Sequence, residues 1–526
     1  MDVVIVGAGP AAAGAALALA ERGDARVRIL DVGGRLEPEL DAARRHLASL
    51  PPSSWDLRER ARVAVVAEPR HDHRLPEKRT FGSDFPFRDF GQREGLADDA
   101  HVVSGALGGF SNTWGAQTMA YSAASFEDWP VTRDQLEPHY RAVLAALPYA
   151  GEVDDLAEYF PLFGEADPLP PLAGNAQRIL ERYERHRLAV RRAGVLVGRA
   201  RLAMRASACV SCGLCMTGCP YGLVYSAAQT IEALKSAGRV EYRGGVLALE
   251  VGEDDGRPHV VVRPREGGPR EVVEADAVLL ATGAIATTRL VAGSLGQWGR
   301  PVPMVESAQF VVPLVSARAT HPAREEGSFT LNQFNLLLPF DEAGHDLVQI
   351  HGYPYSRALD SALPGPLRRG ALAPLGEAIL RRVTVGLGYL PSWWSPGFEV
   401  TVTPGASGDG LARVGISPTP GRDEAARRRL HEVAGRLARA GRHLGVWPVV
   451  PMMALSAATK SYHFGGSFAH RDDPRPGLDS DVLGRVAPWR HVHLVDASVF
   501  PTVSATTFTL TIMANAHRIA SALEVR

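Results

Sequence analysis

The clearest pattern of hydrophobic and polar positions lies at the start of the chain. Val3–Val6 is a β-branched run, which is typical of a buried parallel strand. An alanine-rich stretch that ends near Arg22 predicts a helix, and Gly23 predicts the place where that helix stops. A second apolar run, Val27–Leu30, predicts a neighbouring strand. The first 31 residues therefore predict one strand–helix–strand unit.

The same patterns recur along the chain. Apolar runs predict further strands at 240–251, 260–263, 275–281, 310–315 and 329–338. Helical spacing of apolar residues predicts helices at 133–147, 226–237 and 423–439, and another helix that starts near Phe508. The strand at 275–281 leads into Thr282-Gly283-Ala284, so the chain returns there to a strand–glycine unit. Strands alternating with helices favour an α/β fold.

The turn between the first strand and the first helix is rich in glycine. It reads Gly7-Ala-Gly9-Pro-Ala-Ala12, the dinucleotide fingerprint with alanine in the third glycine position. Asp31 follows Ala12 by 19 residues, where a carboxylate can accept hydrogen bonds from an adenosine ribose. An acidic residue here argues against a 2′-phosphate. The unit predicts a bound FAD or NAD, and the fingerprint alone leaves the choice open.

Composition and charge exclude several kinds of partner. The chain has 526 residues, of which 45% are hydrophobic, and its formal net charge is −1. This balance gives no reason to expect nucleic acid or an anionic membrane as a partner. No run of about 18 apolar residues suggests a transmembrane helix, and the N-terminus lacks the basic region of a signal peptide. We therefore expect a cytoplasmic protein without a transmembrane segment.

A second glycine-rich segment, 102–119, contains small and polar residues that suit a planar ligand. Its candidate binding residues are Gly108, Gly109, Ser111 and Asn112. Glycine permits close approach of the backbone to a ligand. By itself the segment is equally compatible with an ordinary turn.

All four cysteines lie within eleven residues and precede Pro220. They are Cys209, Cys212, Cys215 and Cys219. The spacing is the ferredoxin-like Cys-x2-Cys-x2-Cys-x3-Cys-Pro, which predicts a [3Fe–4S] or a [4Fe–4S] cluster. A structural zinc ion is one alternative, although zinc sites favour more widely separated cysteine pairs. Free thiols or disulfides are another, and a cytoplasmic location disfavours disulfides.

Four motifs, in this order, resemble those of the glucose–methanol–choline family of flavin oxidoreductases. They are the N-terminal fingerprint, the loop GALGGFSNTWG, the second glycine motif ATGAIATTRL, and VDASVFPT followed by LTIMANA. The resemblance spans the chain, although the middle third matches only in general character. It selects FAD over NAD.

The resemblance implies a set of cofactor-binding residues. Gly7, Gly9, Ala12 and Asp31 would hold the AMP half of FAD, and Val246 would contact the adenine. The remaining positions lie near the flavin, its ribityl chain or the pyrophosphate: Gly108, Gly109, Ser111, Asn112, Gly283, Asp496 and Ala497. Some relatives link FAD covalently to a histidine, and Thr113 stands at that position here. We therefore predict non-covalent FAD.

The resemblance also implies the catalytic residues. His463, in the segment KSYHFGGSFAH, falls where the family keeps its catalytic histidine. Thr507 stands where the family has a second Asn or His. A threonine hydroxyl can hydrogen-bond an alcohol, but it is not a base near neutral pH. The active site is thus a histidine with a hydroxyl partner, or another residue substitutes.

The implied reaction is oxidation of an alcohol to a carbonyl by hydride transfer to flavin N5. Electrons would then pass to O2 or to a redox protein or quinone, directly or through an iron–sulfur cluster. Polar residues of the middle region favour a sugar, aminocyclitol or polyol as substrate; these are Asn332, Gln333, Asn335 and Tyr353. Three alternatives stay open: a lyase or decarboxylase on the same fold, an oxidase of an apolar alcohol, and an electron-relay protein.

The implied fold is α/β, with a discontinuous Rossmann-like FAD domain and an inserted α+β substrate domain built on an antiparallel sheet. The FAD domain would comprise residues 1–125, 196–306 and 455–526, and the substrate domain residues 126–195 and 307–454. The cysteine segment would lie in the second FAD stretch, and His463 in the third.

Overall fold

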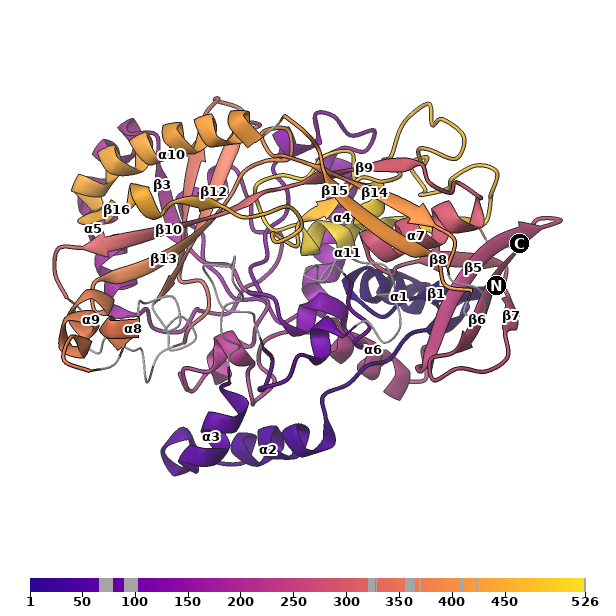
Figure 1. Ribbon diagram of the computed structural model, residues 1–526, viewed down its shortest axis with the longest axis horizontal. Helices are drawn as coiled ribbons and strands as arrows, with labels where there is room; N and C mark the ends of the chain where they lie inside the picture. The colour runs from indigo at the N-terminus through magenta and orange to yellow at the C-terminus, as the bar shows by residue number, and fades with distance from the viewer. Residues whose placement is uncertain are drawn as a thin grey trace.

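The computed structural model describes residues 1–65, 79–88, 103–319, 327, 329–354, 365–368, 370–405, 410–421 and 423–524. In Figure 1 one large sheet lies at the left and the other lies right of the middle, and residues of both line the cavity described below. Helices α2 (Pro38–Ala48) and α3 (Leu57–Val63) project at the lower edge of that view.

One sheet is parallel and has the strand order β19-β8-β1-β2-β4. Its strands are β1 (Asp2–Val6), β2 (Arg26–Leu30), β4 (Glu241–Arg243), β8 (Ala277–Leu280) and β19 (Val492–Leu494). They come from three separate stretches of the chain. Residues Val3, Val4 and Ile5 of β1 are fully buried, as the apolar run predicts for a central strand.

Helix α1 (Pro10–Arg22) follows β1 and packs against α11 (Thr509–Ser521). Gly23 ends α1 in the left-handed conformation, with φ of 72°, and its N–H donates to the carbonyl of Leu19 at 3.0 Å. The two helices touch closely at Gly14, where an added Cβ would lie 2.3 Å from the carbonyl oxygen of Met513. The alanines and glycine of α1 thus let two helices and the sheet pack tightly.

The second large sheet is antiparallel, with the order β16-β10-β13-β12-β11-β3 and β17 paired to β10. Its strands are β3 (Leu196–Arg199), β10 (Gln309–Ser316), β11 (Phe334–Pro339), β12 (Leu347–Pro354), β13 (Val383–Tyr389), β16 (Val446–Pro448) and β17 (Ala454–Leu455). Helices α5 (Gly174–Arg192) and α10 (Asp423–Leu444) cover one face of it (Figure 1).

Side chains alternate across β12 as the two-residue period of a strand requires. Val348 and Ile350 belong to the apolar core beneath α5 and α10. His351 and Tyr353 line the cavity instead. The face of this sheet away from the helices therefore forms one wall of the site.

Smaller elements complete the fold. A four-stranded sheet has the order β15-β14-β9-β18, and a three-stranded sheet has the order β5-β6-β7. Their strands are β9 (Pro301–Glu306), β14 (Phe398–Thr403), β15 (Arg413–Pro418), β18 (Phe464–Gly465), β5 (Val246–Asp254), β6 (Arg257–Pro264) and β7 (Glu271–Glu274). The other helices are α4 (Arg133–Ala146), α6 (Ala227–Ser236), α7 (Ala284–Ser294), α8 (Gly365–Arg368) and α9 (Ala373–Leu380).

The predicted fold class is confirmed: a parallel sheet with helices is joined to a part built on an antiparallel sheet. The single strand expected at 240–251 is wrong, because Gly244-Gly245 interrupts it and Gly245 has φ of 79°. Strand β3 begins at the predicted boundary of 195 and 196, yet it pairs with β11 of the antiparallel sheet. Among the described residues, no helix combines the length and apolar character needed to cross a membrane.

Candidate active site

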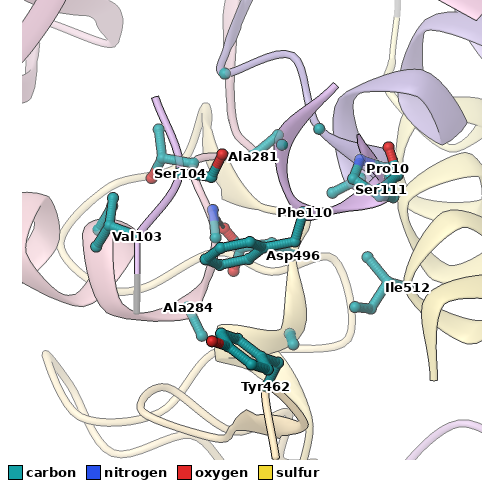
Figure 2. Close-up of a pocket in the computed structure, with 18 of the residues that line it drawn as sticks. Pro10, Val103, Ser104, Phe110, Ser111, Ala281, Ala284, Tyr462, Asp496 and Ile512 are labelled. Carbon is teal, nitrogen blue, oxygen red and sulfur yellow. Dashed lines mark hydrogen bonds between the residues drawn. The ribbon is translucent and has the colours of Figure 1, made fainter. Parts of the chain in front are cut away.

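A long cavity lies between the parallel sheet and the antiparallel sheet. It encloses about 1660 Å³ of space between atoms, including the part open to solvent. Its walls come from the fingerprint turn, the loop after residue 102, the start of α7, strands β12 and β13, and the loop around His463. Figure 2 shows part of this lining, with the rings of Phe110 and Tyr462 close to each other; their centroids are 5.3 Å apart.

The fingerprint turn forms one end of the cavity. Gly7 has φ of 100°, its N–H donates to Leu30 at 2.8 Å, and an added Cβ would lie 2.5 Å from the carbonyl oxygen of Ala281. Gly9 differs, because a Cβ there would meet no atom within 4 Å. Gly7 is thus required by the fold, whereas Gly9 leaves open space at the N-terminus of α1, where the helix dipole favours a negative group.

Asp31 lies at the end of β2 and also lines the cavity. Its Oδ2 accepts hydrogen bonds from the Tyr242 hydroxyl and the Gly33 N–H, both at 3.0 Å. Burial raises the pKa of this carboxyl group to about 6. Tyr242 was not expected from the sequence. It fixes the carboxylate at the position that the fingerprint assigns to a ribose contact.

The second glycine-rich loop is held together by its own side chains. Gly109 and Ser111 line the cavity, whereas Gly108 and Asn112 are not part of the lining. The Asn112 amide donates to the carbonyls of Leu107 and Gly109, at 2.9 and 2.8 Å. Asn112 therefore shapes the loop. The portion of segment 102–119 at residue 102 lies outside the described residues.

The remaining predicted cofactor residues fall into two groups. Val246, Gly283, Asp496 and Ala497 line the cavity, and Ala12 is buried within α1 away from it. Asp496 accepts hydrogen bonds from the Gly283 N–H at 2.8 Å and the Ser498 N–H at 2.9 Å. Its carboxylate thereby joins the end of the parallel sheet to the start of α7, and burial raises its pKa.

His463 lies just before β18 and lines the cavity. The residue is half-buried, and desolvation of its ring lowers its pKa to about 3. The ring stacks on Tyr389, with centroids 4.6 Å apart, and contacts Phe508 at 4.9 Å. Among the described residues, Nδ1 of His463 has no hydrogen-bonding partner. The imidazole is therefore neutral near pH 7.

The loop that carries His463 is anchored by a buried carboxylate. Glu306, at the end of β9, accepts hydrogen bonds from the Thr459 N–H at 3.1 Å and the Ser461 hydroxyl at 2.7 Å. The Ser461 oxygen in turn accepts the N–H of His463 at 3.0 Å. Burial raises the pKa of Glu306. Sequence reasoning missed Glu306, because nothing in the local pattern links it to a loop more than 150 positions later.

Thr507 also lines the cavity, directly before the start of α11. Its side chain is buried, and its Oγ1 has no hydrogen-bonding partner in the described structure. Phe508 and Thr509 lie beside it in the lining. The structure thus brings His463 and Thr507, the two predicted catalytic residues, into the same cavity.

Two cavity residues on the antiparallel sheet were not predicted. His351 in β12 and Tyr389 in β13 both line the cavity, with ring centroids 5.1 Å apart. The available signal was the alternation in LVQIHGYP, which places Gln349, His351 and Tyr353 on one face of a strand.

Most of the polar residues that were expected to face a substrate do not line the cavity. Tyr353 and Gln117 line the cavity, but Asn332, Gln333 and Asn335 do not. Asn332 donates to Gln117 Oε1 at 2.9 Å and to Asn335 Oδ1 at 3.0 Å. These amides form a buried network behind the wall, and Gln117 is its member at the cavity.

The four cysteines lie together on one loop behind the same wall. All four are free thiols, and the Thr330 N–H donates to Cys215 Sγ at 3.4 Å. Burial raises the pKa of the Cys212 and Cys215 thiols to about 11 and 12. Within the described ranges, no group of three or more His, Cys, Asp or Glu residues is arranged to hold a metal ion. The geometry of Cys209, Cys212, Cys215 and Cys219 therefore does not support the predicted cluster.

The cavity fits the non-covalent FAD expected from the sequence. Gly9 provides an open cradle at a helix N-terminus, and Asp31 stands where a ribose would be bound. His463 and Thr507 both line this cavity, and each has a buried polar atom without a partner among the described residues. One continuous space thus joins a dinucleotide cradle to a group able to accept a proton.

Solved structures share this fold over nearly the whole chain. Pyridoxine 4-oxidase from Mesorbium loti is similar with a TM-score of 0.59 and 15% identity, covering 99% of this chain and 98% of that one. A formate oxidase from Aspergillus oryzae RIB40, in a structure that concerns the effect of a mutation on FAD modification, is similar with a TM-score of 0.61 and 15% identity, covering 99% and 97%. No protein-family model matches the sequence, and no curated protein matches it either.

Proposed function

We propose that this protein is an FAD-dependent oxidoreductase of the glucose–methanol–choline type that oxidises an alcohol to a carbonyl. The observation that carries the proposal is the neutral imidazole of His463, whose Nδ1 has no partner among the described residues, in the cavity that begins at the fingerprint turn. The shared fold with a pyridoxine oxidase and an FAD-containing formate oxidase supports it. FAD, when bound, supplies the acceptor for the hydride of the carbinol C–H bond.

In this proposal, residues of the chain accept the proton of the substrate hydroxyl. His463 accepts the proton of the substrate hydroxyl while the carbinol carbon loses its hydride, so that a carbonyl forms. Because burial lowers the pKa of His463 to about 3, the ring is neutral before the reaction and has a nitrogen able to accept that proton. Thr507 orients the hydroxyl through Oγ1, which has no protein partner in the described structure.

The N-terminal end of α11 lies beside these two residues, since Phe508 and Thr509 also line the cavity. Its dipole favours negative charge there. The cofactor residues in this proposal are Gly7, Gly9, Asp31, Gly109, Ser111, Val246, Gly283, Asp496 and Ala497, all of which line the cavity.

The substrate in this proposal is a polar alcohol, because Gln117, Tyr353 and two histidines line the cavity. The two similar structures are both oxidases, and this favours O2 as the electron acceptor over a redox protein or quinone.

Anaerobic mixing of the FAD-loaded protein with a panel of polyols, amino alcohols and simple alcohols tests the proposal. Loss of the oxidised-flavin absorbance band with at least one alcohol is expected. The alternative is a lyase, which is compatible with Thr507 in place of the family's Asn or His. A lyase consumes its substrate while the flavin stays oxidised, and that result would favour a lyase over an alcohol-oxidising enzyme.

The iron–sulfur cluster rests on the cysteine spacing alone and carries no step of the reaction proposed here. Counting iron and acid-labile sulfide in anaerobically purified protein tests whether the cluster is present. Three or four irons per flavin would establish a cluster and favour a dehydrogenase. Protein free of iron would leave the cysteines as thiols on a structural loop.

A further inference from the structure

The cavity contains a second imidazole that the proposed reaction has not used. His351 lies on β12, is 1% exposed and lines the cavity. Its Nε2 has no hydrogen-bonding partner among the described residues. Burial, together with the nearby His463, lowers its pKa to about 3. His351 is therefore neutral, with one ring nitrogen able to donate and the other to accept.

Two other buried histidines of the described chain have hydrogen-bonding partners within the protein. His470 pairs with the Ser480 hydroxyl at 3.0 Å and the Asn515 amide at 3.2 Å. His493 pairs with the carbonyl of Leu483 at 2.9 Å. A buried polar atom without a partner costs about 1–3 kcal/mol. Among the imidazole nitrogens of the described residues, Nε2 of His351 and Nδ1 of His463 are buried without a partner. Both residues line the cavity, where a bound ligand can supply a partner.

The two imidazoles share one neighbour. The ring of Tyr389 stacks on His463 at 4.6 Å and lies 5.1 Å from His351. The Tyr389 hydroxyl accepts a hydrogen bond from the Gln309 amide at 3.0 Å, which holds the ring in place. A single fixed aromatic ring thus contacts both the proposed proton acceptor and a second polar group of the cavity lining.

We propose that His351 binds a second hydroxyl or amino group of the substrate, a few bonds from the carbinol that His463 deprotonates. This inference rests on the proposed function and deepens it: the substrate is a diol or an amino alcohol, and His351 selects it over a simple alcohol. An alcohol without the second group leaves the His351 nitrogen unpaired and loses that hydrogen bond. The preference expected from one such contact is roughly 10- to 100-fold in kcat/KM.

Matched pairs of probes test this, namely 1,2-cyclohexanediol and 2-aminocyclohexanol, each against cyclohexanol. The wild-type protein and the variants His351→Leu and His351→Gln are loaded with FAD and mixed anaerobically with each probe. Wild type is expected to prefer the doubly substituted probe. His351→Leu is expected to slow the doubly substituted probe more than cyclohexanol and so to lose that preference, and His351→Gln, whose amide can hydrogen-bond, retains part of it. Equal slowing of both members of a pair, or an unchanged preference, would overturn the inference.

A binding measurement separates this inference from the proposed function. Calorimetric titration of 1,2-cyclohexanediol into each protein reports binding whether or not the flavin is reduced. Weaker binding to His351→Leu than to wild type, with the flavin still oxidised, supports His351 as a ligand residue and rejects alcohol oxidation of that probe. Equal binding to both proteins rejects the role of His351. FAD content and melting temperature of each variant exclude misfolding as the cause.

Discussion

Gly7 and Gly9 stand two residues apart in one turn, yet the structure requires them for different reasons. Gly7 has a left-handed backbone and no room for a side chain, because the carbonyl of Ala281 lies 2.5 Å from the position of an added Cβ. Gly9 has φ of −84°, which any residue adopts, and its Cβ position is open. The fold requires the first glycine, whereas under the proposed function the bound FAD requires the second.

This difference predicts opposite outcomes for two alanine substitutions. Gly9→Ala should leave the stability of the FAD-free protein within about 1 kcal/mol of wild type but weaken FAD binding at least about tenfold, because a methyl group would fill the space of the pyrophosphate. Gly7→Ala should lower the stability itself. Thermal unfolding of the FAD-free proteins and titration with FAD measure both effects. Wild-type affinity of Gly9→Ala for FAD would contradict a pyrophosphate at this position.

At the scale of elements, the loop 459–463 depends on a side chain of β9, the strand that pairs with β18 directly after the loop. Thr459 and Tyr462 have positive φ values of 71° and 57°, a conformation that costs free energy in residues other than glycine. Glu306 offsets this cost by accepting hydrogen bonds from Thr459 and Ser461. The orientation of His463 thus depends on Glu306, which does not itself line the cavity.

Replacing Glu306 should therefore impair His463 without touching the cofactor site. We expect Glu306→Gln to slow anaerobic flavin reduction about tenfold with unchanged FAD affinity, because its amide cannot accept both hydrogen bonds. Ser461→Ala should act through the same network. In a double-mutant cycle the two effects should be less than additive. Additive effects, or parallel loss of FAD binding, would show that Glu306 serves only general stability.

The sequence predicts the helices and strands best where the pattern is local. Helix α1 with its stop at Gly23, and α4 with its N-cap Thr132, lie where their residues indicate. The predicted helix at 423–439 continues to Leu444 as α10. His351 and Tyr389 could not be assigned in the same way, because they meet only through the pairing of β12 with β13. Glu306 could not be predicted either, because it meets the loop 459–463 only in the folded chain.

At the scale of the whole molecule, the fold keeps several histidines neutral. Burial lowers the pKa of His351, His463 and His470 to about 3, and that of His139 and His493 to about 4. In the unfolded chain these groups titrate near 6.5. Between these values the unfolded state binds more protons than the native state, so stability rises with pH. Asp31, whose pKa is raised to about 6, has the opposite effect, because its contribution to stability falls as the pH rises. It is one group, whereas the histidines are several.

Acidification from pH 7 to pH 5 should therefore destabilise the protein. For His351 and His470, which are almost completely buried, the loss at pH 5 is about 2 kcal/mol each. Thermal unfolding between pH 5 and pH 8 measures this, and His351→Leu, which lacks one of the titrating groups, should show a shallower dependence on pH. A melting temperature that is constant or rises towards pH 5 would contradict neutral histidines in the native state.

The most direct test of alcohol oxidation at this site is anaerobic reduction of the FAD-loaded protein by an alcohol deuterated at the carbinol carbon. We expect loss of the oxidised-flavin band, a slower loss with the deuterated alcohol, and a further decrease of about 10²- to 10⁴-fold in His463→Ala. A flavin that stays oxidised with every alcohol tested, or a reduction that neither deuterium nor His463→Ala slows, would contradict alcohol oxidation at this site.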